Sequence, residues 1–386
     1  MIDNYDLKQL VQPLQTWFAD NARVLPWREN PMAYHVWISE IMLQQTRVEA
    51  VKPYFDRFIR ELPDIKALAV CPEDKLLKLW EGLGYYNRVR NLKIAANQIL
   101  EEYAGVIPNE YDELLKLKGI GSYTAGAIAS IAYGNPVPAV DGNVLRVISR
   151  VTADDSDIMK QNVRKHMEQK LSVLMRENSK VDTQDGVIPA VFNQALMELG
   201  ATVCLPNGAP LCGECPWSEI CEARKQGRIT QLPVKKKAKA RRIEKKTIFI
   251  IKDGEQLALH KRTSKGLLAG LYELPNVEGY LSDQEAIEYI QKQGYAPIRI
   301  QPACDAKHIF SHVEWHMKGY VVFLQAQEFL NDVHGNDVKY ETKKVQDWIF
   351  VNVEETKDNY AIPSAFVKYT EYLNLSIGKD AIVRKN

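Results

Sequence analysis

Two carboxylates stand in unusual surroundings in this chain. Glu40 interrupts the apolar run WISEIML, and Asp141 comes just before an apolar helical pattern that begins at Val144. Burial in an apolar helix raises the pKa of a carboxyl group and keeps it protonated, whereas a helix N-terminus favours the ionised form. Such a pair could divide acid catalysis and cation stabilisation between its members, as glycosidase carboxylates do. Each residue also has a simpler interpretation, Glu40 as a surface helix charge and Asp141 as a helix N-cap.

A glycine hairpin precedes Asp141 in the sequence. Within LLKLKGIGSYTAGAIASIA (114–132), Gly119 and Gly121 flank one apolar residue, and small residues follow that allow a second helix to pack closely. Two glycines let the backbone turn tightly and expose N–H groups at a helix N-terminus, which suits a DNA phosphate. An ordinary structural turn explains the same pattern equally well.

Four of the six cysteines form a second candidate site. Cys204, Cys212, Cys215 and Cys221 are separated by seven, two and five residues. This clustering indicates ligation of a metal or cluster and not a disulfide framework. From the spacing alone, a [4Fe–4S] cluster and a zinc ion held by four thiolates are both compatible.

The elements that must position these residues divide the chain into two domains. A length of 386 residues exceeds one typical core, and the hydrophobic content of 46% is that of a globular protein. Successive amphipathic helices up to about residue 200 predict a mainly α-helical domain over residues 1–225, followed by a basic linker over 226–246. Strands expected at 247–251 and 319–324 and helices at 282–293 and 360–375 predict an α+β domain over 247–386.

Charge and hydropathy narrow the classes of protein. A net charge of +1 excludes a chain that is basic throughout, so nucleic acid would have to bind local basic patches. The N-terminus lacks the pattern of a signal peptide, and the apolar stretch 125–132 is too short to span a bilayer. We therefore expect a cytoplasmic protein that is not associated with a membrane. We also expect it to be a monomer and to be associated with the nucleoid.

Several motifs, in order, resemble the adenine DNA glycosylase (MutY) branch of the helix–hairpin–helix DNA glycosylase superfamily. They are LPWR (25–28), WISEIMLQQT (37–46), EGLGYYNRVRNL (81–92), the hairpin within 110–134, VDGNV (140–144) and FNQALMELGA (192–201). The resemblance spans the first 225 residues. It implies a base-excision repair enzyme that hydrolyses the N-glycosidic bond of adenine mispaired with 8-oxoguanine or guanine in duplex DNA.

The resemblance also implies roles for individual residues. Glu40 would be the general acid and Asp141 the stabiliser of the sugar cation, with Asn143 orienting Asp141 and Tyr123 lying against the reacting centre. Lyase members that resemble endonuclease III carry a lysine in place of Tyr123, so this chain should be monofunctional and leave an abasic site. The implied contacts with DNA are an adenine pocket of Trp27, Arg28 and Gln194, and wedge or lesion contacts at Gln45, Thr46, Leu83 and Tyr85.

For the cysteines, the resemblance favours a [4Fe–4S] cluster over zinc. The family usually has six residues between the first two cysteines, whereas this chain has seven. That departure leaves a zinc site open.

In the second domain, LLAGLYELP (267–275) followed by a helix resembles a Nudix fold. The positions of the glutamates that would hold Mg²⁺ read Gln291 and Lys292. The domain should therefore not hydrolyse nucleotides. The resemblance implies instead that it recognises 8-oxoguanine opposite the adenine. Phe310, Ser311 and His312 match the loop that meets the lesion.

Three alternative functions remain compatible with parts of the sequence. A pyrimidine-specific relative could share the scaffold, but Glu40 and the Nudix-like domain argue against it. A non-catalytic iron–sulfur protein that binds DNA would not need Glu40 and Asp141. A Nudix hydrolase is disfavoured by Gln291 and Lys292.

Overall fold

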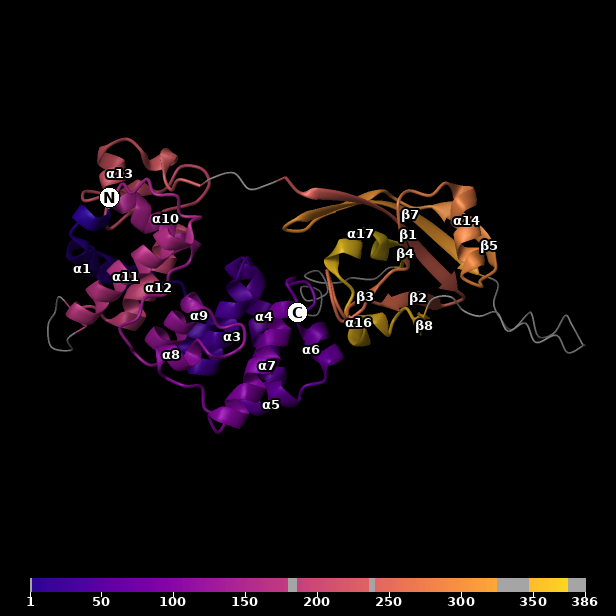
Figure 1. Cartoon of the computed structure of the whole chain (residues 1–386), viewed down its shortest axis with the longest axis horizontal. Coiled ribbons are helices and arrows are strands. Elements are labelled where there is room, and N and C mark those ends of the chain that lie inside the picture. Colours follow the sequence, from indigo (N-terminus) through magenta and orange to yellow (C-terminus); the bar gives the residue numbers. More distant parts are fainter. Residues whose placement is uncertain (1, 180–185, 236–239, 325–346, 374–386) are drawn as a thin grey trace, which may run out of the picture. The chain divides into compact units, whose positions relative to one another are not determined.

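The chain forms two compact units. The computed structural model describes residues 2–179, 186–235, 240–324 and 347–373. One unit comprises Met1–Cys71 and Arg90–Ala238, and the other comprises Pro72–Val89 and Lys239–Asn386 (Figure 1). The grouping of Pro72–Val89 with the second unit differs from the predicted helical domain of residues 1–225. Side chains of this segment bond to the backbone of residues 356–362, a long-range contact that no local pattern encodes.

The first unit is helical, as predicted. Its helices, taken in chain order, are α1 (Val11–Asn21), α2 (Pro26–Glu29), α3 (Ala33–Leu43), α4 (Val48–Glu61), α5 (Ile65–Val70), α7 (Asn87–Glu102), α8 (Tyr111–Leu114), α9 (Ser122–Ala127), α10 (Gly142–Val151), α11 (Gln161–Asn178), α12 (Pro189–Thr202) and α13 (Glu222–Lys225). A π-helical turn, Ile128–Ala132, extends α9, and 3-10 turns lie at Ile2–Asn4, Leu7–Leu10, Cys212–Glu214 and Ile229–Gln231.

Helix α12 lies at the centre of this unit. It packs against α1 and α10, and Leu14, Ile148 and Leu196 from the three helices are fully buried in one core. Trp217, from the cysteine-rich segment, enters the same core, and its indole N–H donates to the carbonyl of Leu10 at 3.0 Å. The cysteine segment is therefore anchored to the helices that carry Asp141 and Gln194.

The eight strands described in the second unit form one sheet. They are β1 (Arg242–Asp253), β2 (Gln256–Lys261), β3 (Tyr272–Glu273), β4 (Asn276–Glu278), β5 (Pro297–Pro302), β6 (Ala306–Ile309), β7 (Val313–Leu324) and β8 (Trp348–Asn352). The main path runs β3-β2-β1-β7-β5, and β4, β6 and β8 pair with β1, β7 and β2. β1 and β7 are parallel and the other pairs are antiparallel.

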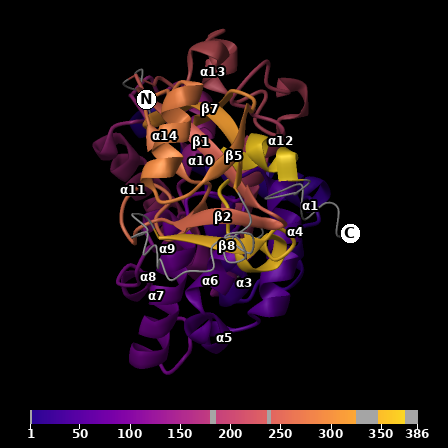
Figure 2. The same ribbon diagram turned by 90° about the vertical axis from the view of Figure 1, so that its right-hand side faces the viewer.

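Both faces of this sheet are covered. Alternation along β1 directs Phe249 and Ile251 toward α14 (Asp283–Lys292), and Ile248 and Ile250 toward the segment that contains Phe366. Figures 1 and 2 show α14 lying against the sheet. The α+β prediction for the second half of the chain is confirmed.

Two local predictions need correction. The linker expected over 226–246 is too long at its C-terminal end, because β1 begins at Arg242 and its charged residues pair with β7 from Arg242↔Val313 onward. The single helix expected over 360–375 is wrong over the described residues. Short turns, Ser364–Phe366, α17 (Val367–Thr370) and Glu371–Leu373, replace it after Pro363, which lacks the N–H that a helix interior needs. Residues 374–375 of that prediction lie outside the described residues.

Ser282 begins the helix that was expected at 282–293. Its hydroxyl and the carboxylate of Glu285 form a capping box. Among the described residues, no helix is both long and apolar enough to cross a membrane.

Close packing at Gly126 positions the segment that leads to Asp141. A Cβ at this residue of α9 would lie 2.2 Å from the carbonyl oxygen of Pro138, three residues before Asp141. Only glycine lets the helix and the Pro138–Ala139 backbone approach this closely.

Replacement of Gly126 by alanine should therefore destabilise the protein. The clash is with backbone atoms that cannot rotate away, so we expect Gly126→Ala to lower the free energy of unfolding by about 2 kcal/mol or more. Urea unfolding of the full chain, followed by tryptophan fluorescence, measures the change. The control is Gly142→Ala, where nothing lies within 4 Å, and its stability should be unchanged or slightly raised. Equal midpoints for the two variants would contradict the packing argument.

Candidate active site

Glu40 is buried in the middle of α3. Its neighbours Ile38, Ser39, Ile41 and Met42 are buried as well, and Glu40 itself is 5% exposed. Burial, with a smaller contribution from the charge of Asp141, raises the pKa of Glu40 to about 7, against opposing effects of Tyr123 and Arg28. The interpretation of Glu40 as a surface charge is therefore wrong. Near neutral pH this carboxyl can both hold and release a proton.

Tyr123 contacts Glu40 directly. Its hydroxyl, carried on α9, donates to Oε2 of Glu40 and lies 3.7 Å from the sulfur of Met197. Burial raises the pKa of Tyr123 far above its usual range, and the charge of Glu40 acts in the same direction. Tyr123 therefore remains a hydrogen-bond donor and orients the Glu40 carboxyl.

Asp141 caps α10, as the simpler interpretation of the sequence predicted. Its Oδ1 accepts the backbone N–H groups of Asn143 and Val144, each at 2.8 Å, and its Oδ2 accepts the Asn143 side-chain amide at 2.8 Å. Burial nevertheless raises the pKa of Asp141, and these hydrogen bonds oppose the rise. The expectation that the environments shift the pKa values of the two carboxyls in opposite directions is therefore wrong. Both are raised, and Glu40 interacts with the charge of Asp141.

Arg146, which sequence reasoning missed, holds Asn143 in place. One guanidinium nitrogen donates to Oδ1 of Asn143 at 2.9 Å and to the carbonyl of Gly200 at 2.7 Å, and Nε donates to the carbonyl of Cys204 at 2.9 Å. A Cβ at Gly200 would lie 2.7 Å from Cβ of Asn143, so glycine makes room for this arrangement. The only sequence signal was a charged residue within an apolar helical face.

Asn193 was also missed, and it holds the strand-like segment before Asp141. It is fully buried on α12, where its Oδ1 accepts the N–H of Ala139 and its Nδ2 donates to Ser130 Oγ and to the carbonyl of Val137. A buried amide that satisfies backbone groups on both sides of Pro138 fixes the path of the chain into the α10 cap.

The predicted adenine-pocket residues lie on α2 and α12. Trp27 is buried edge-to-face against Phe55, with ring centroids 5.4 Å apart. Arg28 lies near enough to Glu40 to lower its pKa, and its guanidinium donates to Glu198 at 2.8 Å. Gln194 donates to the carbonyl of Ala190 within its own helix, so its side-chain bond is local.

Glu198 organises the arginines of this region. It is 1% exposed and accepts from Arg28 and, through both oxygens, from Arg23, which sequence reasoning had not singled out. The two guanidinium groups and their hydrogen bonds lower the pKa of Glu198 against the effect of burial. This buried carboxylate fixes the orientation of Arg28.

Two of the four predicted wedge or lesion residues have strained backbones. Gln45, two residues after the end of α3, has φ 59°, and Thr46 follows it. In the second unit, Tyr85 has φ 49° and is 49% exposed, whereas Leu83 is buried. Non-glycine residues in the left-handed region cluster at functional sites, where the surrounding structure must hold them.

The loop of residues 310–312, which is predicted to contact the lesion and is called the lesion loop below, meets Tyr85 within the second unit. The hydroxyls of Tyr85 and Ser311 are 2.8 Å apart. Phe310 packs edge-to-face against Trp315, and the carbonyl of His312 accepts the N–H of Arg242. The structure thus brings together two of the predicted lesion contacts that are far apart in the sequence.

The glycines of the hairpin occupy different environments. Gly119 has φ +80°, and a Cβ there would lie 2.7 Å from Cβ of Asn91. Gly121 is the N-cap of α9 and has open space around its Cα. The turn therefore requires glycine at 119, while Gly121 leaves the helix start accessible. Binding of a phosphate there stays a prediction.

All four clustered cysteines line one small cavity. Cys204, Cys212, Cys215 and Cys221 face it together with Arg150, whose Nη1 donates to the sulfur of Cys204 at 3.3 Å. Among the described residues, no group of three or more potential ligands lies close enough to hold a single metal ion. One zinc ion would draw four thiolates to about 2.3 Å from its centre. A cavity lined by four thiolates suits either an iron–sulfur cluster or a zinc ion.

Gln291 and Lys292 occupy the last turn of α14, where a Nudix hydrolase would present glutamates. Both side chains are exposed and neither is a carboxylate. These positions therefore lack the carboxylates with which proteins usually bind Mg²⁺.

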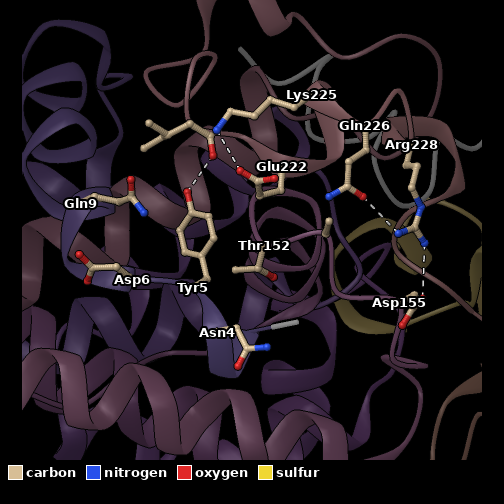
Figure 3. Close-up of a pocket in the computed structure, with 12 residues that line it drawn as sticks. Asn4, Tyr5, Asp6, Gln9, Thr152, Asp155, Glu222, Lys225, Gln226 and Arg228 are labelled. Atoms are coloured by element: carbon tan, nitrogen blue, oxygen red, sulfur yellow. Dashed lines mark hydrogen bonds and ion pairs between the residues drawn. The ribbon is translucent and has the colours of Figure 1, made fainter.

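A separate polar pocket lies in the first unit, between the N-terminal turns and α13 (Figure 3). Its cations are paired with carboxylates, Lys225 with Glu222 at 2.9 Å and Arg228 with Asp155 at 3.5 Å. None of the predicted catalytic residues lines it.

Comparison with known proteins identifies both parts of the chain. Residues 38–173 match the HhH-GPD superfamily of base excision DNA repair proteins, and residues 247–372 match the NUDIX domain. The adenine DNA glycosylase of Rattus norvegicus is 33% identical over 384 residues, with 84% of this chain and 72% of that protein covered. The adenine DNA glycosylase of Homo sapiens is 34% identical (81% and 67% covered), and that of Buchnera aphidicola from Schizaphis graminum is 34% identical (87% and 94% covered).

These matches extend through both units and include the segments that carry Glu40, Tyr123 and Asp141. The resemblance deduced from the motifs is confirmed: this chain belongs to the adenine DNA glycosylase family.

Proposed function

We propose that this protein removes adenine that is mispaired with 8-oxoguanine or guanine in duplex DNA, as a monofunctional glycosylase that leaves an abasic site. The observation that carries the proposal is the group of Glu40, Tyr123 and Asp141, in which Glu40 is buried and the other two residues are partly buried. It combines a carboxyl whose pKa is about 7 with a second carboxylate held at a helix N-terminus. Family membership supports adenine as the base that is released.

The reaction requires two different contributions from the carboxyls. Glu40 in its protonated form donates its proton to a ring nitrogen of adenine, and the bond between the base and C1′ of the sugar breaks with its electrons going to the base. The Asp141 carboxylate stabilises the oxocarbenium-like sugar or traps it covalently. Water then adds to C1′ and loses a proton to the Glu40 carboxylate, which restores the acid.

The neighbours of the two carboxyls keep them in position. Tyr123 donates a hydrogen bond to Glu40. Asn143 donates to Asp141 through its side-chain nitrogen, and its side-chain oxygen accepts from Arg146. Tyr123 stands where a lyase would present a nucleophilic lysine, and its hydroxyl is engaged with Glu40. This arrangement favours attack by water over formation of a Schiff base.

Adenine must leave the base stack to reach Glu40. The side chains proposed as wedges are Gln45 in the first unit and Tyr85 in the second, and each has a positive φ. Trp27 and Arg28 would then contact the flipped base. The hydroxyls of Tyr85 and Ser311 form a polar pair suited to the opposing 8-oxoguanine.

The four cysteines would hold a [4Fe–4S] cluster, which ties the segment of residues 204–221 into one compact module when bound. The cavity that all four line and the hydrogen bond from Arg150 support this assignment. We further propose that the protein acts as a monomer.

Removal of either carboxyl should abolish excision. With Glu40→Gln or Asp141→Asn, we expect the single-turnover rate on adenine opposite 8-oxoguanine to fall about 10²- to 10⁴-fold, with affinity for the duplex retained. Wild-type protein should release adenine opposite 8-oxoguanine and guanine but not opposite thymine, with no strand break and no adduct trapped by borohydride. The absence of adenine release from the first two duplexes would refute the proposed function.

The rate should depend on pH through Glu40. The protonated form is active, so the rate should fall as pH rises through about 7. Since the hydrogen bond from Tyr123 lowers the pKa of Glu40, Tyr123→Phe should shift this decline to higher pH. Single-turnover rates between pH 5 and 9 provide the test. A decline that stays at the wild-type pH in Tyr123→Phe would show that Glu40 is not the titrating group.

Protein purified without oxygen should contain about four irons per chain, because a [4Fe–4S] cluster holds four irons, and it should absorb light at about 400 nm. Cys215→Ala should lose the iron and the absorbance, whereas Cys304→Ala, outside the cluster of cysteines, should retain both. One zinc per chain without iron would overturn the assignment of the cluster.

A further inference from the structure

The second unit contains a pair of buried charges that the proposed chemistry does not use. Lys78, at the end of α6 (Glu73–Leu79), is 14% exposed, and Glu81 is 6% exposed. They form an ion pair at 2.9 Å. Two charges that lose most of their water need further partners, so the remaining contacts of this pair are informative.

Those partners are backbone groups of residues 356–362. The Nζ of Lys78 donates to the carbonyls of Thr356 and Tyr360 at 2.9 and 3.0 Å, and Oε1 of Glu81 accepts the buried N–H of Ile362 at 2.7 Å. The carbonyls and the N–H satisfied in this way come from α16 (Thr356–Asn359) and the turn after it. We call Lys78, Glu81 and these three backbone partners the latch.

The loop of residues 82–85, which we call the wedge loop because it carries Tyr85, begins directly after Glu81 of the latch. Gly82 and Gly84 have φ 96° and 70°, and Tyr85 has φ 49°, so the loop turns sharply. Arg88 donates to the carbonyls of Leu83 and Gly84, each at 3.0 Å, and stacks over the ring of Tyr85. Hydrogen bonds from Arg88 and from the Trp80 indole, which donates to the carbonyl of Gly84 at 3.1 Å, hold the loop, and it joins the latch at Glu81.

The other side of the latch leads to the lesion loop. After Ile362 the chain enters the core at Phe366, which packs on Trp315, and Trp315 packs on Phe310 next to Ser311. The hydroxyls of Ser311 and Tyr85 then close a ring of contacts at 2.8 Å. Each member of the ring is held from two sides.

We infer that Lys78 and Glu81 are positioning residues for lesion recognition: they fix the distance between the Tyr85 and Ser311 hydroxyls, so that the two act as one reader of the base opposite adenine. The inference rests on the proposed function for its substrate. A protein whose reader is pre-arranged in this way discriminates 8-oxoguanine from guanine without reordering the loop. Loss of the latch leaves the catalytic carboxyls intact but loosens the reader.

The test compares Lys78→Met, which keeps the apolar stem, with Asp74→Asn as control. Asp74 also lies on α6 and pairs with Lys261, but both partners are 48% exposed, so this contact should contribute little. Single-turnover rates and affinities are measured on duplexes with adenine opposite 8-oxoguanine and opposite guanine. We expect Lys78→Met to reduce the preference for 8-oxoguanine at least fivefold, with the guanine duplex changed less than twofold, and Asp74→Asn to match the wild type.

A second comparison tests whether the latch acts through the reader. Ser311→Ala should reduce the preference in the wild-type background but change it less than twofold in the Lys78→Met background. Equal losses on both duplexes, or an undiminished effect of Ser311→Ala in Lys78→Met, would overturn the inference. If Lys78→Met does not fold, Glu81→Gln replaces it, since its amide oxygen can still accept from Ile362.

Hydrogen exchange separates failure of this inference from failure of the proposed function. In the protein without DNA, the N–H groups of Leu83 and Arg88 bond to the carbonyls of Trp80 and Tyr85. Their exchange should be at least tenfold faster in Lys78→Met and unchanged in Asp74→Asn. Unchanged exchange in Lys78→Met would refute the latch even if the enzyme excises adenine. If the wild-type protein releases no adenine, the proposed function fails, and exchange alone decides whether the latch holds the loop.

Discussion

Burial of the Glu40 carboxyl is the constraint around which the first unit is built. An ionised carboxylate in this position would lack adequate solvation, and so the group retains its proton up to neutral pH. The cost of burying it is limited by one strong hydrogen bond, from Tyr123. Because Tyr123 stands on α9 and Glu40 on α3, that bond requires the two helices to pack closely.

The position of Asp141 follows from the same packing. Gly126 on α9 lets the Pro138–Ala139 backbone approach, and Asn193 on α12 satisfies the polar groups of that backbone. The chain therefore enters α10 on a fixed path, and the Asp141 side chain is near enough for its charge to raise the pKa of Glu40. Small residues and a buried amide set the path of the chain into α10, and Tyr123 and Arg146 hold the groups around the two carboxyls in place.

The helical and α+β characters of the two units, the burial of Glu40 and the position of Asp141 before a helix could be predicted, because they depend on local patterns. Glu40 lies within an apolar helix, and Asp141 precedes an amphipathic one, and each pattern is contained in about ten residues. The contributions of Arg146, Asn193 and Glu198 could not be predicted, because a polar residue within a helical pattern reads as solvent-facing unless its distant partner is known. The same limit explains the segment 72–89, whose assignment to the second unit depends on backbone partners more than 270 residues away.

Asp141 shows why a structural and a catalytic interpretation of one residue need not compete. As an N-cap it accepts two backbone N–H groups, and these bonds are strongest when the carboxyl is ionised. The interactions that begin α10 thus also favour the charged form that a sugar cation requires, against burial that favours the neutral one. If the cap were absent, the effect of burial would be unopposed by these hydrogen bonds and would raise the pKa of Asp141 further. The helix terminus therefore provides the asymmetry between acid and carboxylate that the proposed reaction needs.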